Sequence, residues 1–163
     1  MSEVQTVSIA VASTSVFLAA IYYILQIRHQ TRLRETDLLI RLFSIATDRE
    51  LQKDFAKVSQ CEYGDYGDFV QKYGSISDEK SEVELKKSFS YVINLGELLG
   101  LLLKRKVTSI DFLYDVFGSL SKGLWEKVKP IVEGTREESG NPRIGEYFEY
   151  LYNEMKKKEQ KLK

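Results

Sequence analysis

The sequence has few of the residues that build disulfides and metal sites. Its 163 residues include one cysteine, Cys61, and one histidine, His29. A single cysteine forms no internal disulfide, and it fits a reducing compartment such as the cytoplasm. Neither residue has a second cysteine or histidine to complete a metal site. We therefore expect no metal and no cofactor.

Sequence signatures of nucleotide and nucleic-acid binding are also absent. The chain has no glycine-rich phosphate loop and no surface pattern of alternating aromatic and basic residues. The part from residue 28 onward contains 24 basic and 23 acidic residues, and the one remaining acidic residue is Glu3. A nearly neutral domain has no general attraction to nucleic acid, so we expect no such partner.

Charge is missing altogether from Val4 to Ile27. The part from Val7 to Ile27 is 21 residues, and as a helix it would be roughly 31 Å long, about the thickness of a bilayer's hydrocarbon core. A buried core helix is the alternative, but an uncharged stretch of this length exceeds what globular helices usually show. The pattern predicts a transmembrane helix and, as partner, the lipid bilayer.

Three arginines, Arg28, Arg32 and Arg34, follow this stretch at once. Basic residues beside a span favour the cytoplasmic side of the membrane. We take them as the topology determinants of a single-pass protein in the cell membrane. The N-terminus is then expected outside and the C-terminal domain in the cytoplasm.

The rest of the chain predicts helices. Strand signals are nearly absent, with no long alternating run and no Asn-Gly or Asp-Gly turn. Apolar residues instead recur at steps of three and four, as in amphipathic helices. The predicted fold is all-α, with the transmembrane helix continuing into a cytoplasmic bundle of about five helices. The predicted domains are 1–27, the tail and span, and 28–163, the helical domain.

Local motifs in the first half suggest where helices begin and end. Residues 47–50, Thr-Asp-Arg-Glu, resemble a capping box that starts a helix. The tripeptide Tyr-Gly-Asp occurs twice in succession, over residues 63–68, and its glycines indicate a connector. Its tyrosines could form a recognition surface, but we favour their packing the connector onto the core. Gly96 and Gly100, four residues apart, would let another helix approach closely.

Local motifs in the second half suggest three further boundaries. Ser109 or the preceding threonine is expected to start a helix, with a possible break near Gly118 or Gly123. Residues 134–140 are expected to form a polar loop. Asn141 is expected to cap the last helix, with a proline at its first position.

Glu97 is the leading candidate site residue. It lies in the apolar run of residues 95–103, where an unpaired carboxylate is costly to bury. A buried acid with a raised pKa can be a catalytic base. We favour a structural role, because no histidine, nucleophile or second inward carboxylate lies near it in sequence. Its expected partners complete a candidate buried polar cluster: Asn94, Glu97, Trp125, Arg136 and Arg143.

Several segments resemble an uncharacterised family. They are residues 22–31, 37–42, 96–105, 125–126, 130–131, 142–144 and 147–151. Together they resemble small archaeal and bacterial single-span membrane proteins, whose all-helical cytoplasmic domain is of unknown function. The resemblance covers most of the chain. It implies one membrane helix and a helical domain, and it brings no activity.

Three functions remain open. The leading hypothesis is a membrane-anchored protein-interaction or scaffolding module on the cytoplasmic face, which binds an unknown protein partner or itself. The second is a membrane-proximal enzyme that uses Glu97, and a solvent-open pocket lined by Arg136 or Arg143 would favour it. The third is a small regulator that associates with another membrane protein through Ser8, Ser13 and Ser15 of its span. The absence of a catalytic set favours a non-enzymatic role.

Overall fold

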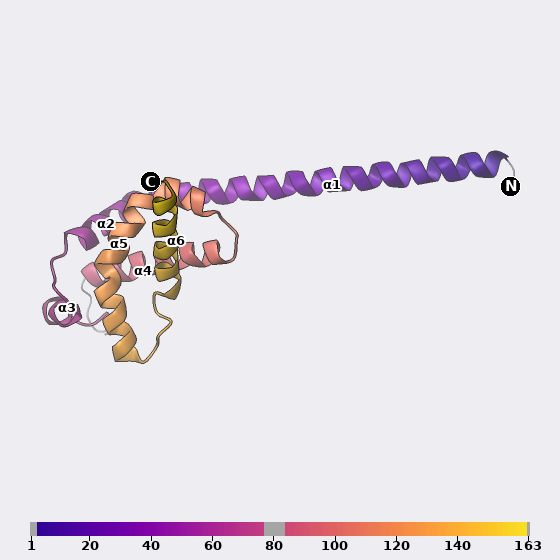
Figure 1. The fold of residues 1–163 in the computed structure, drawn as a ribbon. Coiled ribbons are helices and arrows are strands. Elements are labelled where there is room, and N and C mark those ends of the chain that lie inside the picture. The colour runs from indigo at the N-terminus through magenta and orange to yellow at the C-terminus, as the bar shows by residue number, and fades with distance from the viewer. Residues whose placement is uncertain (1–2, 77–83, 163) are drawn as a thin grey trace. The chain divides into compact units, whose positions relative to one another are not determined.

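The computed structural model describes residues 3–76 and 84–162, apart from the side chains of residues 3, 4, 6, 7, 9–11, 35, 119 and 120. Over these residues the chain is helical and contains no strand, as predicted (Figure 1). The described part has six helices: α1 (Glu3–Ala46), α2 (Arg49–Gln60), α3 (Tyr66–Tyr73), α4 (Glu84–Lys104), α5 (Ile110–Ser139) and α6 (Glu146–Leu162).

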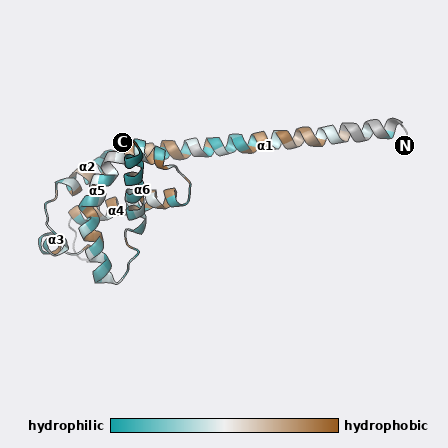
Figure 2. Cartoon of the chain, in the orientation of Figure 1, coloured by the Kyte–Doolittle hydropathy of each residue, from teal (hydrophilic) through white to brown (hydrophobic). Residues whose placement is uncertain are grey.

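Helix α1 continues without a break through the arginines that follow the uncharged stretch, as predicted. Every described side chain from Ala12 to Arg34 is exposed. Figure 2 shows hydrophobic residues in the middle of this helix, followed by a hydrophilic stretch. Among the described residues, however, no helix is both long enough and apolar enough to cross a membrane. Most side chains at the start of the predicted span, from Val7 to Val11, lie outside the described set.

The chain divides into two compact units, residues 1–42 and 43–163. The predicted domain boundary follows Ile27, where the uncharged stretch ends. The second compact unit begins further along the chain, at Phe43. The five helices after α1 form the second unit, in agreement with the predicted bundle. Its core holds the fully buried residues Leu51, Val58, Phe69, Phe89, Val92, Leu113, Val128, Ile131, Val132, Phe148, Leu151 and Met155.

Helix α4 is the central helix of the bundle. It packs against α2, α5 and α6, and its contact with α6 is the most extensive between any two helices. The exposed residues of α4 are Glu84, Lys87, Tyr91, Asn94, Leu98 and Lys104. The remaining sides carry buried residues such as Phe89, Val92 and Leu99, as expected for a nearly all-apolar helix.

Three predicted boundaries need correction. The side chain of Asp48, not Thr47, caps α2, and it accepts hydrogen bonds from the backbone N–H groups of Glu50 and Leu51. Helix α5 runs through Gly118, Gly123 and the predicted loop as one helix of 30 residues, capped by Ser109. It ends only at Gly140, whose left-handed backbone (φ 65°) suits a residue without a Cβ.

The tyrosines of the Tyr-Gly-Asp repeat pack the connector onto α5, as favoured from the sequence. The Tyr63 hydroxyl donates to the backbone carbonyl of Lys127, and the Tyr66 hydroxyl donates to Glu138 at 2.5 Å. Gly134 of α5 lies against the Tyr66 ring so closely that an added Cβ would come within 2.0 Å of it. Tyr63 and Tyr66 therefore have a structural role.

Candidate functional site

The Glu97 carboxylate caps the N-terminus of helix α6. Its Oε1 atom accepts hydrogen bonds from the backbone N–H groups of Tyr147 at 2.8 Å and Phe148 at 2.9 Å. The first N–H groups of a helix have no partner within the helix, and the N-terminal end of the helix dipole favours a negative charge. Glu97 is thus a capping residue supplied by another helix, fifty positions earlier in the chain.

Two glycines of α4 make this approach possible. A Cβ on Gly96 would lie 2.2 Å from the Phe148 ring, and a Cβ on Gly100 would lie 1.8 Å from the backbone oxygen of Tyr147. The predicted role of this glycine pair, close approach of another helix, is therefore confirmed. Any larger side chain at Gly100 would displace the first turn of α6 and move its N–H groups away from Glu97.

The start of α6 differs from the prediction because of Gly145. The side chain of Asn141 accepts from the backbone N–H of Arg143 at 3.1 Å, which makes a local turn, but no helix begins there. Gly145 then has a left-handed backbone, φ 72°, and an added Cβ would lie 2.6 Å from Val132. The helix can therefore begin only at Glu146, where the preceding residue has no side chain to serve as a cap.

Opposing effects act on the pKa of Glu97. Removal of the half-buried carboxyl from water raises its pKa, and this effect is the largest. The two backbone hydrogen bonds and the positive charge of Arg136 lower the pKa, while the negative charge of Glu146 raises it. The net shift is upward. A raised pKa is one property of a catalytic base, but here its cause is the burial of the carboxyl between packed helices.

Arg136 connects α5 to α6 near the same point. Its Nε donates to the backbone carbonyl of Ile144 at 2.6 Å, and its terminal nitrogen donates to Glu149 at 2.9 Å. The guanidinium side chain is mostly buried and the Glu149 carboxylate is partly exposed. Arg136 therefore holds both the turn before α6 and the Glu149 side chain near the start of α6, while Glu97 caps the first N–H groups of that helix.

The other members of the predicted cluster lie apart from the carboxylate. Asn94 is exposed on the outer face of α4. Arg143 is exposed, and its Nε is 3.4 Å from Glu146. Trp125 is buried and contacts the rings of Phe148 and Tyr152 edge-on and tilted, respectively. Of the partners expected for Glu97, only Arg136 acts on it, through its charge.

Sequence reasoning identified Glu97 but missed its partner. A carboxylate in an apolar run suggests a buried ion pair, because side chains are the partners that a sequence displays. The sequence signal for the actual partner is the lack of a capping side chain before the last helix. Gly145, directly before the last helix, offers no side-chain oxygen, so the first N–H groups of that helix need an acceptor from elsewhere.

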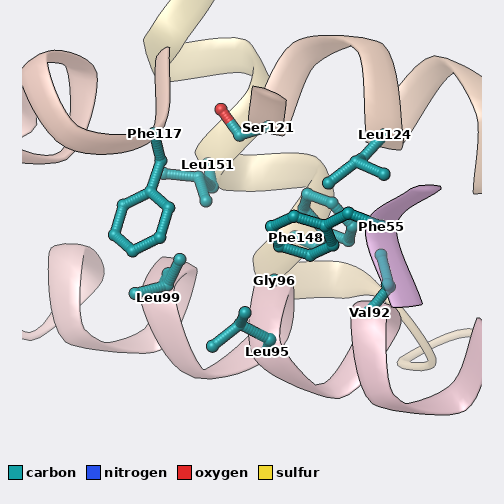
Figure 3. Close-up of a pocket in the computed structure, with 10 residues that line it drawn as sticks. All are labelled: Phe55, Val92, Leu95, Gly96, Leu99, Phe117, Ser121, Leu124, Phe148 and Leu151. Carbon is teal, nitrogen blue, oxygen red and sulfur yellow. The ribbon is translucent and has the colours of Figure 1, made fainter. Parts of the chain in front are cut away.

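A small apolar cavity lies beside this contact, between α2, α4, α5 and α6 (Figure 3). Its volume is about 20 Å³, room for about one water molecule and far below the several hundred Å³ of a typical ligand site. The Ser121 hydroxyl is its only polar side chain. The lining residues are Phe55, Val92, Leu95, Gly96, Leu99, Phe117, Ser121, Leu124, Phe148 and Leu151. Glu97, Arg136 and Arg143 do not line this cavity.

The described residues show no cluster that could bind a metal ion through three or more His, Cys, Asp or Glu side chains. Cys61 is buried, and His29 lies on the exposed part of α1. The carboxylate with the most distinctive surroundings, Glu97, already accepts two hydrogen bonds from the backbone. The arrangement as a whole is suited to holding helices together.

Comparison with known proteins identifies the family of the chain. Residues 9–155 match a family described as a domain of unknown function, DUF4760, and the chain belongs to this family. The match covers α2 to α5 completely, and α1 and α6 in large part. No curated protein and no solved structure matches the chain.

Proposed function

We propose that this protein is a membrane-tethered interaction module, in which α1 holds the helical bundle at the cytoplasmic face of the cell membrane. The observation that carries the proposal is the exposed apolar surface of α1. Its large exposed apolar and aromatic residues within the uncharged stretch are Val16, Phe17, Leu18, Ile21, Tyr22, Tyr23, Ile24, Leu25 and Ile27. Each Å² of apolar surface left in water costs about 25 cal/mol, so this helix requires a covering.

Lipid accounts for that covering better than a protein groove does. The apolar residues at 16–18 and 21–25 occupy every side of the helix, because consecutive positions are 100° apart. A helix that is apolar all round suits a buried or lipid environment, whereas an amphipathic helix suits a groove. The proposal takes the uncharged stretch from Val4 to Ile27 as one span. The arginines that follow it then lie at the cytoplasmic surface.

A role in binding, rather than catalysis, is supported by the structural roles of the charged residues in the bundle and by the size of its cavity. Glu97 caps a helix, Arg136 pairs with Glu149, and the cavity beside them is too small for a substrate. The alternative, an enzyme that uses Glu97, would need a solvent-open pocket lined by Arg136 or Arg143. The apolar cavity at the α4–α6 contact is not of that kind.

Fractionation of cells that express the full chain tests the tether. We expect the wild-type chain in the membrane pellet after alkaline carbonate washing. Leu18→Arg should move much of it to the supernatant, because an arginine at a span centre costs about 3 kcal/mol of insertion free energy. Gln30→Arg, beyond the uncharged stretch, is the matched control and should stay in the pellet. A wild-type chain found in the supernatant would refute the proposal.

Cysteine labelling tests the orientation. A cysteine at Ser2 should react with an impermeant thiol reagent outside intact cells, and Asn153→Cys should react only after lysis. Asn153 is exposed on α6, whereas the native Cys61 is buried and would be protected on either side of the membrane. Reaction of the Asn153→Cys variant in intact cells, with none at residue 2, would reverse the proposed orientation.

A further inference from the structure

Helix α1 has an exposed face beyond the uncharged stretch that lipid does not explain. Leu33 and Ile40 are 55% and 64% exposed, and they lie seven residues apart on one side of the helix. The buried residue Leu42, 2% exposed, lies on the opposite side. Thr36 lies between Leu33 and Ile40 at steps of three and four. We call these three residues, Leu33, Thr36 and Ile40, the pairing face.

We propose that the pairing face binds the same face of a second copy of this chain, in a parallel two-stranded coiled coil. The steps of three and four are the spacing of the a and d positions in such coils. Leu33 and Ile40 occupy a positions and Thr36 the d position between them. The Thr36 hydroxyl donates to the carbonyl of Arg32 at 2.9 Å, so it brings no unpaired donor into the contact.

Charge complementarity selects a second copy as the occupant. Arg32 and Asp37 flank the pairing face on its two sides, at the g position and at the e position five residues later. In a parallel coiled coil, g of one chain lies beside e of the next heptad of the other chain, so two Arg32–Asp37 pairs form across the dimer. Asp37 already pairs with Arg41 of its own helix at 2.8 Å, and its second carboxylate oxygen remains available for the partner's arginine.

The same register continues into the uncharged stretch. Ala12, Ser15 and Ala19, all exposed, occupy the corresponding positions in its first part, and Tyr22 follows them. The short side chains of the first three allow two membrane helices to approach closely there. Gln26 occupies an a position between the two parts, where a polar side chain fixes register. The parallel orientation rests on the proposed tether, since one membrane inserts every copy in the same direction.

Disulfide cross-linking of the full chain in membranes tests the pairing. Leu33→Cys and Ile40→Cys should form dimers under mild oxidation. Arg34→Cys and Arg41→Cys, which lie on the flank of the same exposed helix, are matched controls and should give little dimer. The buried native Cys61 provides the background in every sample. Equal cross-linking at all four positions, or none, would overturn the proposal, as would a product of another mass that shows a different protein on this face.

Charge exchange tests the partner's identity. Arg32→Asp alone or Asp37→Arg alone should reduce Ile40→Cys dimers about fivefold, because each places like charges across the dimer. The double exchange should restore dimers towards the original yield. Failure of the double exchange to restore them would overturn the assigned register.

Membrane fractionation of the same samples separates this inference from the proposed tether. Chains in the membrane pellet without specific dimers would refute the pairing and leave the tether intact. Chains in the supernatant with specific dimers at Leu33→Cys and Ile40→Cys would refute the tether and support the pairing.

Discussion

At the scale of single residues, the Glu97 carboxylate contributes the most distinctive contact in the bundle. A buried ion pair would lose about 3–5 kcal/mol when one partner is removed. A capping carboxylate that is half-buried contributes less, because water can reach the N–H groups once the side chain is gone. Removing Glu97 should therefore cost less stability than breaking a buried ion pair would.

We predict that Glu97→Ala lowers the free energy of unfolding by about 1–2 kcal/mol, the usual cost of a lost helix cap. Glu97→Gln should cost less, since its amide oxygen can still accept from the N–H groups of Tyr147 and Phe148. Thermal or urea unfolding of the two variants beside the wild type measures both values. A loss above about 3 kcal/mol for Glu97→Ala would instead indicate an uncompensated buried charge.

The raised pKa of Glu97 predicts that the stability of the protein depends on pH. Because burial raises the folded-state pKa of Glu97 above its unfolded value, the native protein holds this proton more tightly. The stabilisation is complete below the ordinary glutamate pKa and is lost as pH rises through the folded-state pKa. The stability of wild type relative to Glu97→Gln, which does not titrate, should therefore fall as pH rises above the ordinary glutamate pKa of about 4.3. A relative stability that rises over this range would show that the two N–H groups outweigh burial.

At the scale of helices, glycines decide how closely α4 and α6 pack. We predict that Gly100→Ala lowers the free energy of unfolding by several kcal/mol, because its Cβ would lie 1.8 Å from the backbone oxygen of Tyr147. Gly123→Ala is the matched control: it lies within helix α5, and its Cβ would meet nothing within 4 Å. That variant should be unchanged or more stable by up to about 1 kcal/mol. Equal effects of the two substitutions would contradict the packing role.

The helices themselves could be predicted from the sequence, and some of their ends could not. Apolar residues spaced three and four apart indicate which face of a helix is buried. The spacing of the apolar residues therefore predicts α2 and α4 at the positions where the structure has them. Gly118 and Gly134 suggested a break and a loop in α5, but tertiary packing overrides their low helix propensity. The last helix starts at Glu146 because Gly145 packs against Val132, a contact that no local pattern displays.

At the scale of the whole molecule, the second compact unit contains nearly the entire core. We predict that a chain lacking residues 1–31 is soluble, strongly helical by circular dichroism and cooperative on melting, because its amphipathic helices cover one another without lipid. A chain that ends at Gly145 is the contrasting variant and should lose cooperative melting, since α6 supplies Phe148, Leu151 and Met155 to the core. Disorder of the first fragment in water would show that lipid or a partner is part of the fold.

The order of synthesis gives the α4–α6 contact a further consequence. The ribosome makes α4 some forty residues before the first turn of α6. Until α6 emerges, the glycine-lined side of α4 lacks the helix that covers it. Nascent chains of this protein thus pass through a period with exposed apolar surface, when chaperones are needed most. A premature stop between Lys104 and Glu146 leaves a product fixed in that state.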